Sequence, residues 1–181
     1  MIVSITGTPG VGKTSVSNYL RNKDYFVVDL HEIINKYNFV TDIDEKRDSK
    51  IVDIKKLNNY VLENFKDKEL VFIESHLSHS LDYVDKVILI RLHPKRLRKN
   101  LEKRGWSKEK IKENIEAESL DVILCEVADS FEEKNIFEID ATDKSIDKIG
   151  DIIIQIVEKE FKNMKNYKIG KIDWSEEILD M

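Results

Sequence analysis

Short apolar runs alternate along the chain with longer stretches in which apolar residues recur every three or four positions. The runs predict buried strands over residues 2–6, 25–29, 70–73, 87–92 and 136–140. The stretches between them predict helices over residues 14–21, 31–37, 52–65, 94–105, 107 to about 130, and 146–161. Because buried strands that alternate with helices form parallel sheets covered on both faces, we predict an α/β fold with a five-stranded parallel sheet.

Two segments show neither period. Residues 38–50 are polar and charged, and they predict a loop or a small mobile insertion. Residues 162–181 form a polar tail, in which DWSEEIL could make a short amphipathic turn. The sequence contains no repeat, no low-complexity tract and no linker rich in proline or glycine. We therefore expect one compact domain over residues 1–161, followed by the tail.

The segment GTPGVGKT follows the first predicted strand and precedes the first predicted helix. Its spacing is that of a P-loop (a Walker A motif), whose glycines let backbone N–H groups curl around phosphate while the helix N-terminus attracts the same anion. Lys13 is expected to reach the β- and γ-phosphates, Thr14 to ligate Mg²⁺, and Ser15 to contact the α-phosphate. The predicted phosphate-binding residues are thus Gly10, Gly12, Lys13, Thr14 and Ser15. The motif predicts binding of ATP or GTP, and it leaves the phosphoryl acceptor open.

Acidic residues end three of the predicted strands, at Asp29, Glu74 and Asp140. Parallel sheets gather functional groups at the carboxyl ends of their strands, and P-loop sites place an acid there near Mg²⁺ and its waters. Glu74 is the candidate for this role, the alternative being a solvated carboxylate at the start of a loop. His76 follows two residues later, so it could orient water or phosphate from the same side, the alternative being a structural histidine.

The other histidines and the single cysteine predict no separate chemistry. His79 lies further into the same loop and is a weaker site candidate, whereas His31 and His93 look structural or exposed. The pair of His76 and His79 lacks a cysteine partner and an HExxH pattern, which argues against zinc. Cys125 lies in the apolar helical context VILCEVA, so we expect a buried, inert thiol.

Arg104 ends a strongly basic helix and directly precedes Gly105. An arginine beside a glycine hinge could swing onto the γ-phosphate as a lid residue and neutralise charge during transfer, which makes Arg104 a catalytic candidate. Arg96 and Arg98 on the same helix are more typical of a solvated face.

Charge and hydropathy argue against two classes of partner. The chain has 30 basic and 35 acidic residues, and its net charge of −5 is spread over interspersed positions. This argues against nucleic-acid binding, including direct sequence-specific binding. No run of about 18 apolar residues occurs, so we expect no membrane span. The N-terminal apolar run lacks the basic segment of a secretory signal, and with one cysteine the chain suits a reducing cytoplasm.

Four features occur together and resemble the adenylate kinase isoenzyme 6 family, also called the CINAP family, in its archaeal form. They are the P-loop near the N-terminus, the acid-x-His step Glu74-Ser75-His76, the stretch RGWSKEKIKENIEAE that starts at Arg104, and the strand ending in Asp140. The resemblance covers roughly residues 1–160, and the RGWS stretch is its most specific part.

This resemblance implies an adenylate-kinase topology, with a region that binds a nucleoside monophosphate near residues 30–53 and a short lid near residues 103–113. It implies reversible transfer of the γ-phosphoryl group of ATP to AMP, with some ATPase activity. It also implies a role in maturation of the small (30S) ribosomal subunit through a platform ribosomal protein. Arg104 takes the position of the lid arginine, and the P-loop residues take the phosphate-binding positions.

Two positions differ from the family pattern. Glu74 stands where the family has Asp, which lengthens the acid by one methylene. Residues 38–53 contain one arginine, Arg47, where ordinary adenylate kinases have an arginine-rich AMP clamp. AMP as the acceptor is therefore less strongly indicated than ATP as the donor.

Three rival functions remain open at this point. One is an ATPase switch, in which nucleotide binding changes a protein-binding state. Another is an assembly factor for a basic ribosomal protein, which the acidic surplus and the tail around Trp174 permit. A kinase for another small molecule, such as shikimate or a nucleoside, would need an acceptor-binding set of arginines that the sequence does not display.

Overall fold

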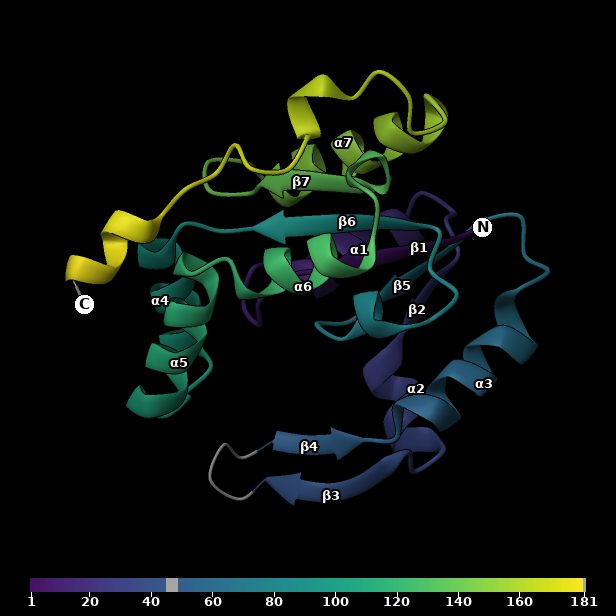
Figure 1. Cartoon of the computed structure of the whole chain (residues 1–181), viewed down its shortest axis with the longest axis horizontal. Helices are drawn as coiled ribbons and strands as arrows, with labels where there is room; N and C mark the ends of the chain where they lie inside the picture. The colour runs from purple at the N-terminus through teal and green to yellow at the C-terminus, as the bar shows by residue number, and fades with distance from the viewer. Residues whose placement is uncertain (45–48, 181) are drawn as a thin grey trace.

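A five-stranded parallel sheet forms the centre of the molecule (Figure 1). The computed structural model describes residues 1–44 and 49–180. The strand order is β2-β5-β1-β6-β7, and every neighbouring pair is parallel. The strands are β1 (Ile2–Thr6), β2 (Val27–Asp29), β5 (Val71–Glu74), β6 (Lys86–Arg91) and β7 (Ile136–Asp140). The predicted α/β class and five-stranded parallel sheet are confirmed.

Seven α-helices connect or flank the strands in the described ranges. They are α1 (Lys13–Arg21), α2 (Leu30–Lys36), α3 (Ile54–Phe65), α4 (Pro94–Lys103), α5 (Lys108–Ser119), α6 (Val122–Ser130) and α7 (Ile146–Glu158). Short 3₁₀ turns add η1 (Ser78–Ser80), η2 (Glu133–Asn135), η3 (Lys165–Tyr167) and η4 (Ser175–Asp180). Ser107 caps α5 by accepting from the N–H of Lys110, which explains why the chain restarts a helix there.

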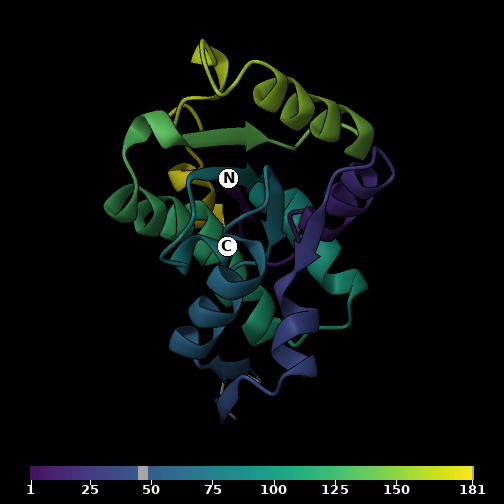
Figure 2. The same cartoon turned by 90° about the vertical axis from the view of Figure 1, so that its right-hand side faces the viewer.

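Alternating side chains along the strands divide the core between the two faces of the sheet. Val3 and Ile5 of β1 pack in one cluster with α1 and α7, whereas Ile2 packs with residues of α3. Near β6 and β7 the second face is covered by α6, where Val127 packs with Val87. Helices therefore cover both faces, as predicted. Figure 2 shows α7 and the hairpin described next at opposite ends of the molecule.

For residues 38–50 the sequence predicted a loop or a small mobile insertion, whereas the described part of this segment contains strands. In the described part, β3 (Val40–Asp44) and β4 (Ser49–Val52) pair as an antiparallel hairpin with an irregularity between Val40 and Asp42. The hairpin was missed because both of its faces are largely open to solvent, so no alternation of apolar and polar residues is needed. Arg47, the arginine noted for the acceptor region, lies outside the described residues.

The prediction of one long helix over residues 107–130 was also wrong. The chain breaks between α5 and α6 at Asp121, whose φ of 58° lies in the left-handed region. Asp is one of the few residues that adopt this conformation without large strain, and its carboxylate is held by Arg91. The break escaped the sequence analysis because no glycine or proline marks it.

The prediction that Cys125 is buried was wrong. Cys125 lies on α6. Cys125 is exposed, and Val127 is the only buried residue of α6, a helix that the structure describes completely. The helix lies on the outside of the sheet with most of its surface toward solvent, so its apolar sequence does not mean burial. Val122, the first residue of α6, and Leu120 just before it are likewise exposed.

The tail (yellow in Figure 1) runs from the end of α7 back to α4. The N–H of Gly170 donates to Glu138 of β7 at 3.1 Å, and the Trp174 ring lies 5.0 Å from the guanidinium carbon of Arg91. Glu177 then pairs with Lys95 at 2.9 Å. Within the described ranges, no helix has the length and apolar character needed to cross a membrane.

Candidate nucleotide site

The loop between β1 and α1 has a backbone that only glycine allows. Gly7 and Gly10 have φ values of 139° and 100°, which L side chains rarely adopt. A Cβ atom on Gly7 would lie 2.3 Å from the carbonyl oxygen of Ile90, and one on Gly10 would lie 2.7 Å from the side chain of Leu101. The loop is thus pressed against β6 and α4, and its shape requires glycine at both positions.

Lys13 lies inside this loop. Its side-chain ammonium donates to the carbonyl oxygens of Gly7 at 2.7 Å and Thr8 at 3.2 Å, and the residue is only 7% exposed. Burial lowers the pKa of Lys13 to about 8, although the negative charges of Glu74 and Glu118 act in the opposite direction. A cation held in this way is prepared to bind an anion, because a phosphate would restore the interactions that burial removes.

Thr14 and Glu74 bring oxygen donors together at the start of α1. The Thr14 hydroxyl lies 3.4 and 3.5 Å from the two carboxylate oxygens of Glu74, which is only 2% exposed. Burial raises the pKa of Glu74, and the charge of Lys13 opposes this shift. Hydroxyl and carboxylate oxygens are the ligands that Mg²⁺ prefers, and Mg²⁺ keeps several waters, so two protein donors fit it. Among the described residues, no group of three or more His, Cys, Asp and Glu side chains could hold a metal ion.

His76 faces the same space as Lys13. Its ring stacks on His31 of α2, with the ring centres 5.4 Å apart. Burial lowers the pKa of His76 to about 3, and the neighbouring positive charge of Lys13 adds to the effect. His76 is therefore neutral at physiological pH and can offer one donor and one acceptor nitrogen. His31 is exposed, as predicted, but it also lines the site.

The other two histidines have structural contacts. His79 is buried, and its ring nitrogens lie 2.9 Å from the Thr6 hydroxyl and 3.1 Å from a carboxylate oxygen of Glu126. His93 caps α4 by accepting from the N–H of Lys95. Neither residue lines the two cavities described next, so we do not assign His79 or His93 to the nucleotide site.

The first cavity has a volume of about 640 Å³ and opens beside the P-loop. Its walls come from the P-loop, α2, β4, the end of β5 and the α4–α5 segment. The cationic side chains on these walls are Lys13, Lys50, Arg104 and Lys110, and the carboxylates are Glu74 and Glu113. This surplus of positive charge suits a ligand with phosphate groups.

A second cavity of about 470 Å³ lies between α4 and the loop that follows β7. Gly10, Gly12 and Arg104 line both cavities. Ser15 lines only the second cavity, whereas Lys13 and Thr14 line only the first. The two hollows therefore meet at the phosphate loop and at one arginine.

Arg104 stands at the C-terminal end of α4, directly before the turn into α5. Its guanidinium carbon lies 5.9 Å from the ring centre of Trp106, which itself lines the first cavity. Asn100, one turn earlier, donates to the carbonyl oxygen of Gly10 at 2.9 Å. This bond holds α4 against the P-loop and so sets the position of the Arg104 backbone relative to the loop.

The remaining strand-end acids shape loops. Asp29 accepts from the N–H of His31 at 2.7 Å and so caps α2, while its charge adds to the raised pKa of Glu74. Asp140 accepts from the N–H of Thr142 at 2.8 Å in the loop that lines the second cavity. Both acids thus support cavity walls without facing the P-loop lysine.

Comparison with known proteins identifies the family. A family model described as "AAA domain" matches residues 3–121. The "Putative adenylate kinase" of Methanosarcina barkeri is 43% identical, over 96% of this chain and 97% of its own. The protein of the same description from Methanocaldococcus jannaschii is 38% identical, over 99% of this chain and 96% of its own. The chain belongs to the AAA-domain family, and to the same group as these archaeal relatives. The resemblance to archaeal adenylate kinases is thereby confirmed.

Two solved kinase structures share the fold of this chain. Shikimate kinase from Acinetobacter baumannii, in complex with shikimate, has a TM-score of 0.62 at 15% identity. The matched region covers 88% of this chain and 93% of the shikimate kinase. Thymidylate kinase from Candida albicans has a TM-score of 0.58 at 12% identity, with 88% and 91% covered. At these identities the likeness shows the fold alone, and the predicted P-loop fold class is confirmed.

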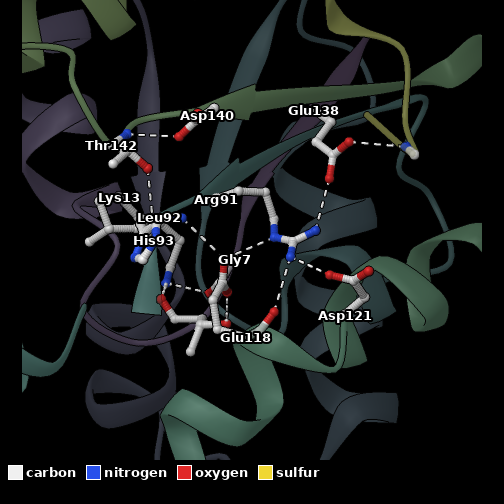
Figure 3. A network of polar contacts seen from close by, with 12 residues as sticks. Gly7, Lys13, Arg91, Leu92, His93, Glu118, Asp121, Glu138, Asp140 and Thr142 are labelled. Atoms are coloured by element: carbon white, nitrogen blue, oxygen red, sulfur yellow. Dashed lines mark hydrogen bonds and ion pairs between the residues drawn. The ribbon is translucent and has the colours of Figure 1, made fainter. Parts of the chain in front are cut away.

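One buried cluster in this AAA-domain chain was missed by the sequence analysis. Arg91 ends β6 and is 2% exposed, and it binds the carboxylates of Glu118, Asp121 and Glu138 (Figure 3). Burial works against its charge, but the attraction of Glu118 and Asp121 outweighs it and raises the pKa of Arg91. The available signal was a charged residue at the end of an otherwise apolar strand, VILIR.

Proposed function

We propose that this protein is a nucleoside monophosphate kinase that transfers the γ-phosphoryl group of ATP to AMP in the presence of Mg²⁺, giving two ADP. The observation that carries the proposal is the pair of cavities that share Gly10, Gly12 and Arg104. A transfer between two nucleotides needs two binding spaces that meet at the phosphates, and this arrangement supplies them. The adenylate-kinase description of the archaeal relatives supports the same reaction.

We assign the donor base to the second cavity and the acceptor to the first. The second cavity lies beside Ser15 and the loop after β7, and no described residue of the hairpin lines it. The first cavity is bordered by α2 and β4, which belong to the proposed acceptor region over residues 30–53. The α4–α5 segment around residues 103–113 borders the first cavity from the other side and serves as the lid.

The side chains can divide the work of transfer as follows. Backbone N–H groups of the P-loop and the ammonium of Lys13 hold the β- and γ-phosphates. Thr14, with Glu74 through a water, would hold Mg²⁺, which neutralises charge on the phosphates when it is bound. Arg104 closes over the γ-phosphoryl group during transfer. In this step the bond between the γ-phosphorus and the oxygen that leaves with ADP breaks, and a bond between the γ-phosphorus and a phosphate oxygen of AMP forms.

Because His76 is neutral, it is suited to orient a water or a phosphate oxygen, and it is not suited to neutralise the negative charge of the phosphates. With a pKa near 3 it carries no proton to give at pH 7, so it can position a water or a phosphate oxygen only by hydrogen bonding. Its stacking on His31 limits the rotation of its ring. We propose that this pair sets the floor of the acceptor space.

A product assay tests the reaction directly. Purified protein is mixed with ATP, Mg²⁺ and AMP, and the nucleotides are resolved by chromatography. Formation of two ADP for each AMP consumed is expected. Parallel reactions with CMP, GMP, UMP and shikimate define the acceptor, and the shikimate reaction matters because shikimate kinases share the fold. Absence of ADP formation with every acceptor would contradict the proposal.

ATP hydrolysis is the alternative outcome at the same site. If phosphate is released from ATP at a rate that AMP does not change, the protein acts as an ATPase, and nucleotide binding then serves as a switch. Both activities use the same P-loop, so a water in the acceptor space would produce ATPase activity beside the kinase activity. A mutant of Lys13 loses both.

A role in small-subunit maturation, through a basic platform ribosomal protein, stays a prediction from the family resemblance. The net charge of −5 is compatible with a basic partner. Co-purification with that protein from cell extract, lost when residues 162–181 are deleted or ATP is in excess, is the expected result. Recovery of the partner in equal amounts with the shortened chain would exclude the tail as its binding element.

A further inference from the structure

A single buried carboxylate joins the P-loop to the lid helix. Glu118 lies in the last turn of α5 and is 2% exposed. One of its oxygens accepts from the side chain of Arg91 at 2.8 Å and from the backbone N–H of Leu92 at 3.1 Å. Its other oxygen accepts from the hydroxyl of Thr8, in the P-loop. The position of Glu118 between the strand end and the loop is seen in Figure 3.

Charge compensation of Arg91 does not explain this contact. Asp121 and Glu138 also bind the guanidinium. Even without Glu118, two carboxylates would therefore compensate the single positive charge of Arg91. The oxygen that accepts from Thr8 is not the one that accepts from the Arg91 side chain. This second oxygen therefore serves the P-loop, where it accepts from the hydroxyl of Thr8, a residue that is 1% exposed.

Helical spacing extends the connection to the first cavity. Lys110, Asn114 and Glu118 follow one another at four-residue intervals on α5, which places them along one side of the helix. Lys110 and Asn114 line the first cavity, and Asn114 also donates to the carbonyl oxygen of Lys110 at 2.7 Å. The side of α5 that faces the ligand space thus ends in the carboxylate that holds the P-loop.

We propose that Glu118 is a positioning residue for phosphoryl transfer. Through its bond to Thr8, Glu118 fixes the position of the P-loop relative to the ligand-facing side of α5. The inference rests on the proposed kinase function. Glu118 lines neither cavity, so it acts through Thr8 and through the helix. When the bond to Thr8 is lost, the loop and the lid helix move independently, and the reacting groups lose their alignment.

The test removes the hydroxyl and leaves the Arg91 cluster intact. Thr8→Val has nearly the same shape as Thr8, and Thr8→Ser keeps the hydroxyl. We expect kcat of Thr8→Val to fall about 10- to 100-fold, because misplacement of reacting groups by about 1 Å has effects of this size. The KM values for ATP and AMP should change less than kcat. Thr8→Ser should keep kcat within about twofold of the wild type, on the same reasoning.

Two controls separate positioning from stability. Glu116→Gln changes a half-buried acid on the same helix, which pairs with Lys112 at 3.7 Å and lines neither cavity, and it should leave kcat unchanged. All rates are measured well below the midpoint of thermal unfolding of each variant, so a merely structural role of Thr8 would not move kcat. Hydrogen exchange, which needs no acceptor, should become faster in residues 7–12 and in α5 together in Thr8→Val.

A double mutant shows whether the two residues act as one unit. In a Glu118→Ala background, Thr8→Val should cause no further loss of kcat. Full additivity, wild-type kcat in Thr8→Val, or an equal loss in Thr8→Ser would overturn the inference. If Glu118→Ala does not fold, the Thr8 pair and the exchange data decide. If the wild type forms no ADP from ATP and AMP, the proposed function fails, and unchanged exchange in Thr8→Val would then overturn the positioning inference separately.

Discussion

The hydroxyl of Thr14 lies 3.4 Å from one carboxylate oxygen of Glu74 and 3.5 Å from the other. Because both groups are oxygen donors at the start of α1, Glu74→Gln should weaken Mg²⁺ binding while leaving the fold intact. Loss of a carboxylate that acts through water typically costs about 10- to 100-fold in metal affinity. We expect the Mg²⁺ concentration for half-maximal rate to rise by that factor, and chelation of Mg²⁺ by EDTA to stop the wild type.

Two comparison variants sharpen this metal prediction. Glu74→Asp keeps the charge in a shorter side chain, so it should need less Mg²⁺ than Glu74→Gln. Glu63→Gln alters an exposed acid on α3 and should leave the Mg²⁺ dependence unchanged. A wild-type Mg²⁺ profile in Glu74→Gln would remove Glu74 from the metal site.

Lys13→Ala should lower turnover of ATP by at least about 10²- to 10³-fold, the loss typical for one strong donor to a developing charge. The ammonium is held by the carbonyl oxygens of Gly7 and Thr8, so the substitution removes the cation that the loop itself encloses. Lys23→Ala, which removes an exposed lysine beyond α1, serves as the control. Equal ADP formation by the two variants would refute the site assignment.

Arg104→Ala should reduce kcat more than it reduces ATP affinity. Arg104 lines both cavities, so its charge is available to the phosphoryl group as it passes between donor and acceptor. We expect a loss in kcat of about 10²-fold, with a change in ATP dissociation constant below about tenfold. Arg98→Ala, on the exposed side of α4, should match the wild type in both measurements. A change confined to ATP affinity would assign Arg104 to binding alone.

Gly7→Ala should destabilise the protein strongly, because the new Cβ would lie 2.3 Å from the backbone of Ile90 at a φ of 139°. Gly170→Ala is a matched control, since Gly170 also has a positive φ but has open space around it. We expect the control to cost about 1 kcal/mol in free energy of unfolding, from backbone strain alone. Gly7→Ala should cost clearly more in the same denaturant titration. Equal costs would mean that the loop can move away from β6.

The tail contributes to stability through Trp174, whose ring lies over Arg91 and beside His93. Trp174→Ala should lower the free energy of unfolding by about 1–2 kcal/mol, the range for a partly desolvated cation–π contact. Trp174→Phe keeps an aromatic face and should recover more than half of this loss. A tail that detaches in solution would show no difference between the three proteins.

The strands and the phosphate loop could be predicted from the sequence because local pattern determines them. Apolar runs marked all five strands of the sheet, and the P-loop spacing placed Lys13 and Thr14 at the start of α1, in the loop that follows β1. The β3–β4 hairpin could not be found in this way, because its residues are mostly exposed and carry no periodic signal.

Long-range pairing explains the other omissions. Arg91 meets Glu118, Asp121 and Glu138, which lie 27, 30 and 47 positions later, and nothing in a local window indicates such contacts. The same contacts explain why Asp121 breaks the helix that the apolar period predicts. By contrast, the four-residue spacing from Lys110 to Glu118 was visible in the sequence and could have marked one side of α5.

The buried guanidinium of Arg91 also constrains the order in which a newly made chain can fold. An unpaired charge in that apolar layer would cost several kcal/mol, so the end of β6 cannot be enclosed before residues 118–138 have been synthesised. Thr8 depends on the same late segment for its hydrogen bond. The phosphate-binding loop leaves the ribosome early and acquires its final geometry only after most of the domain has emerged.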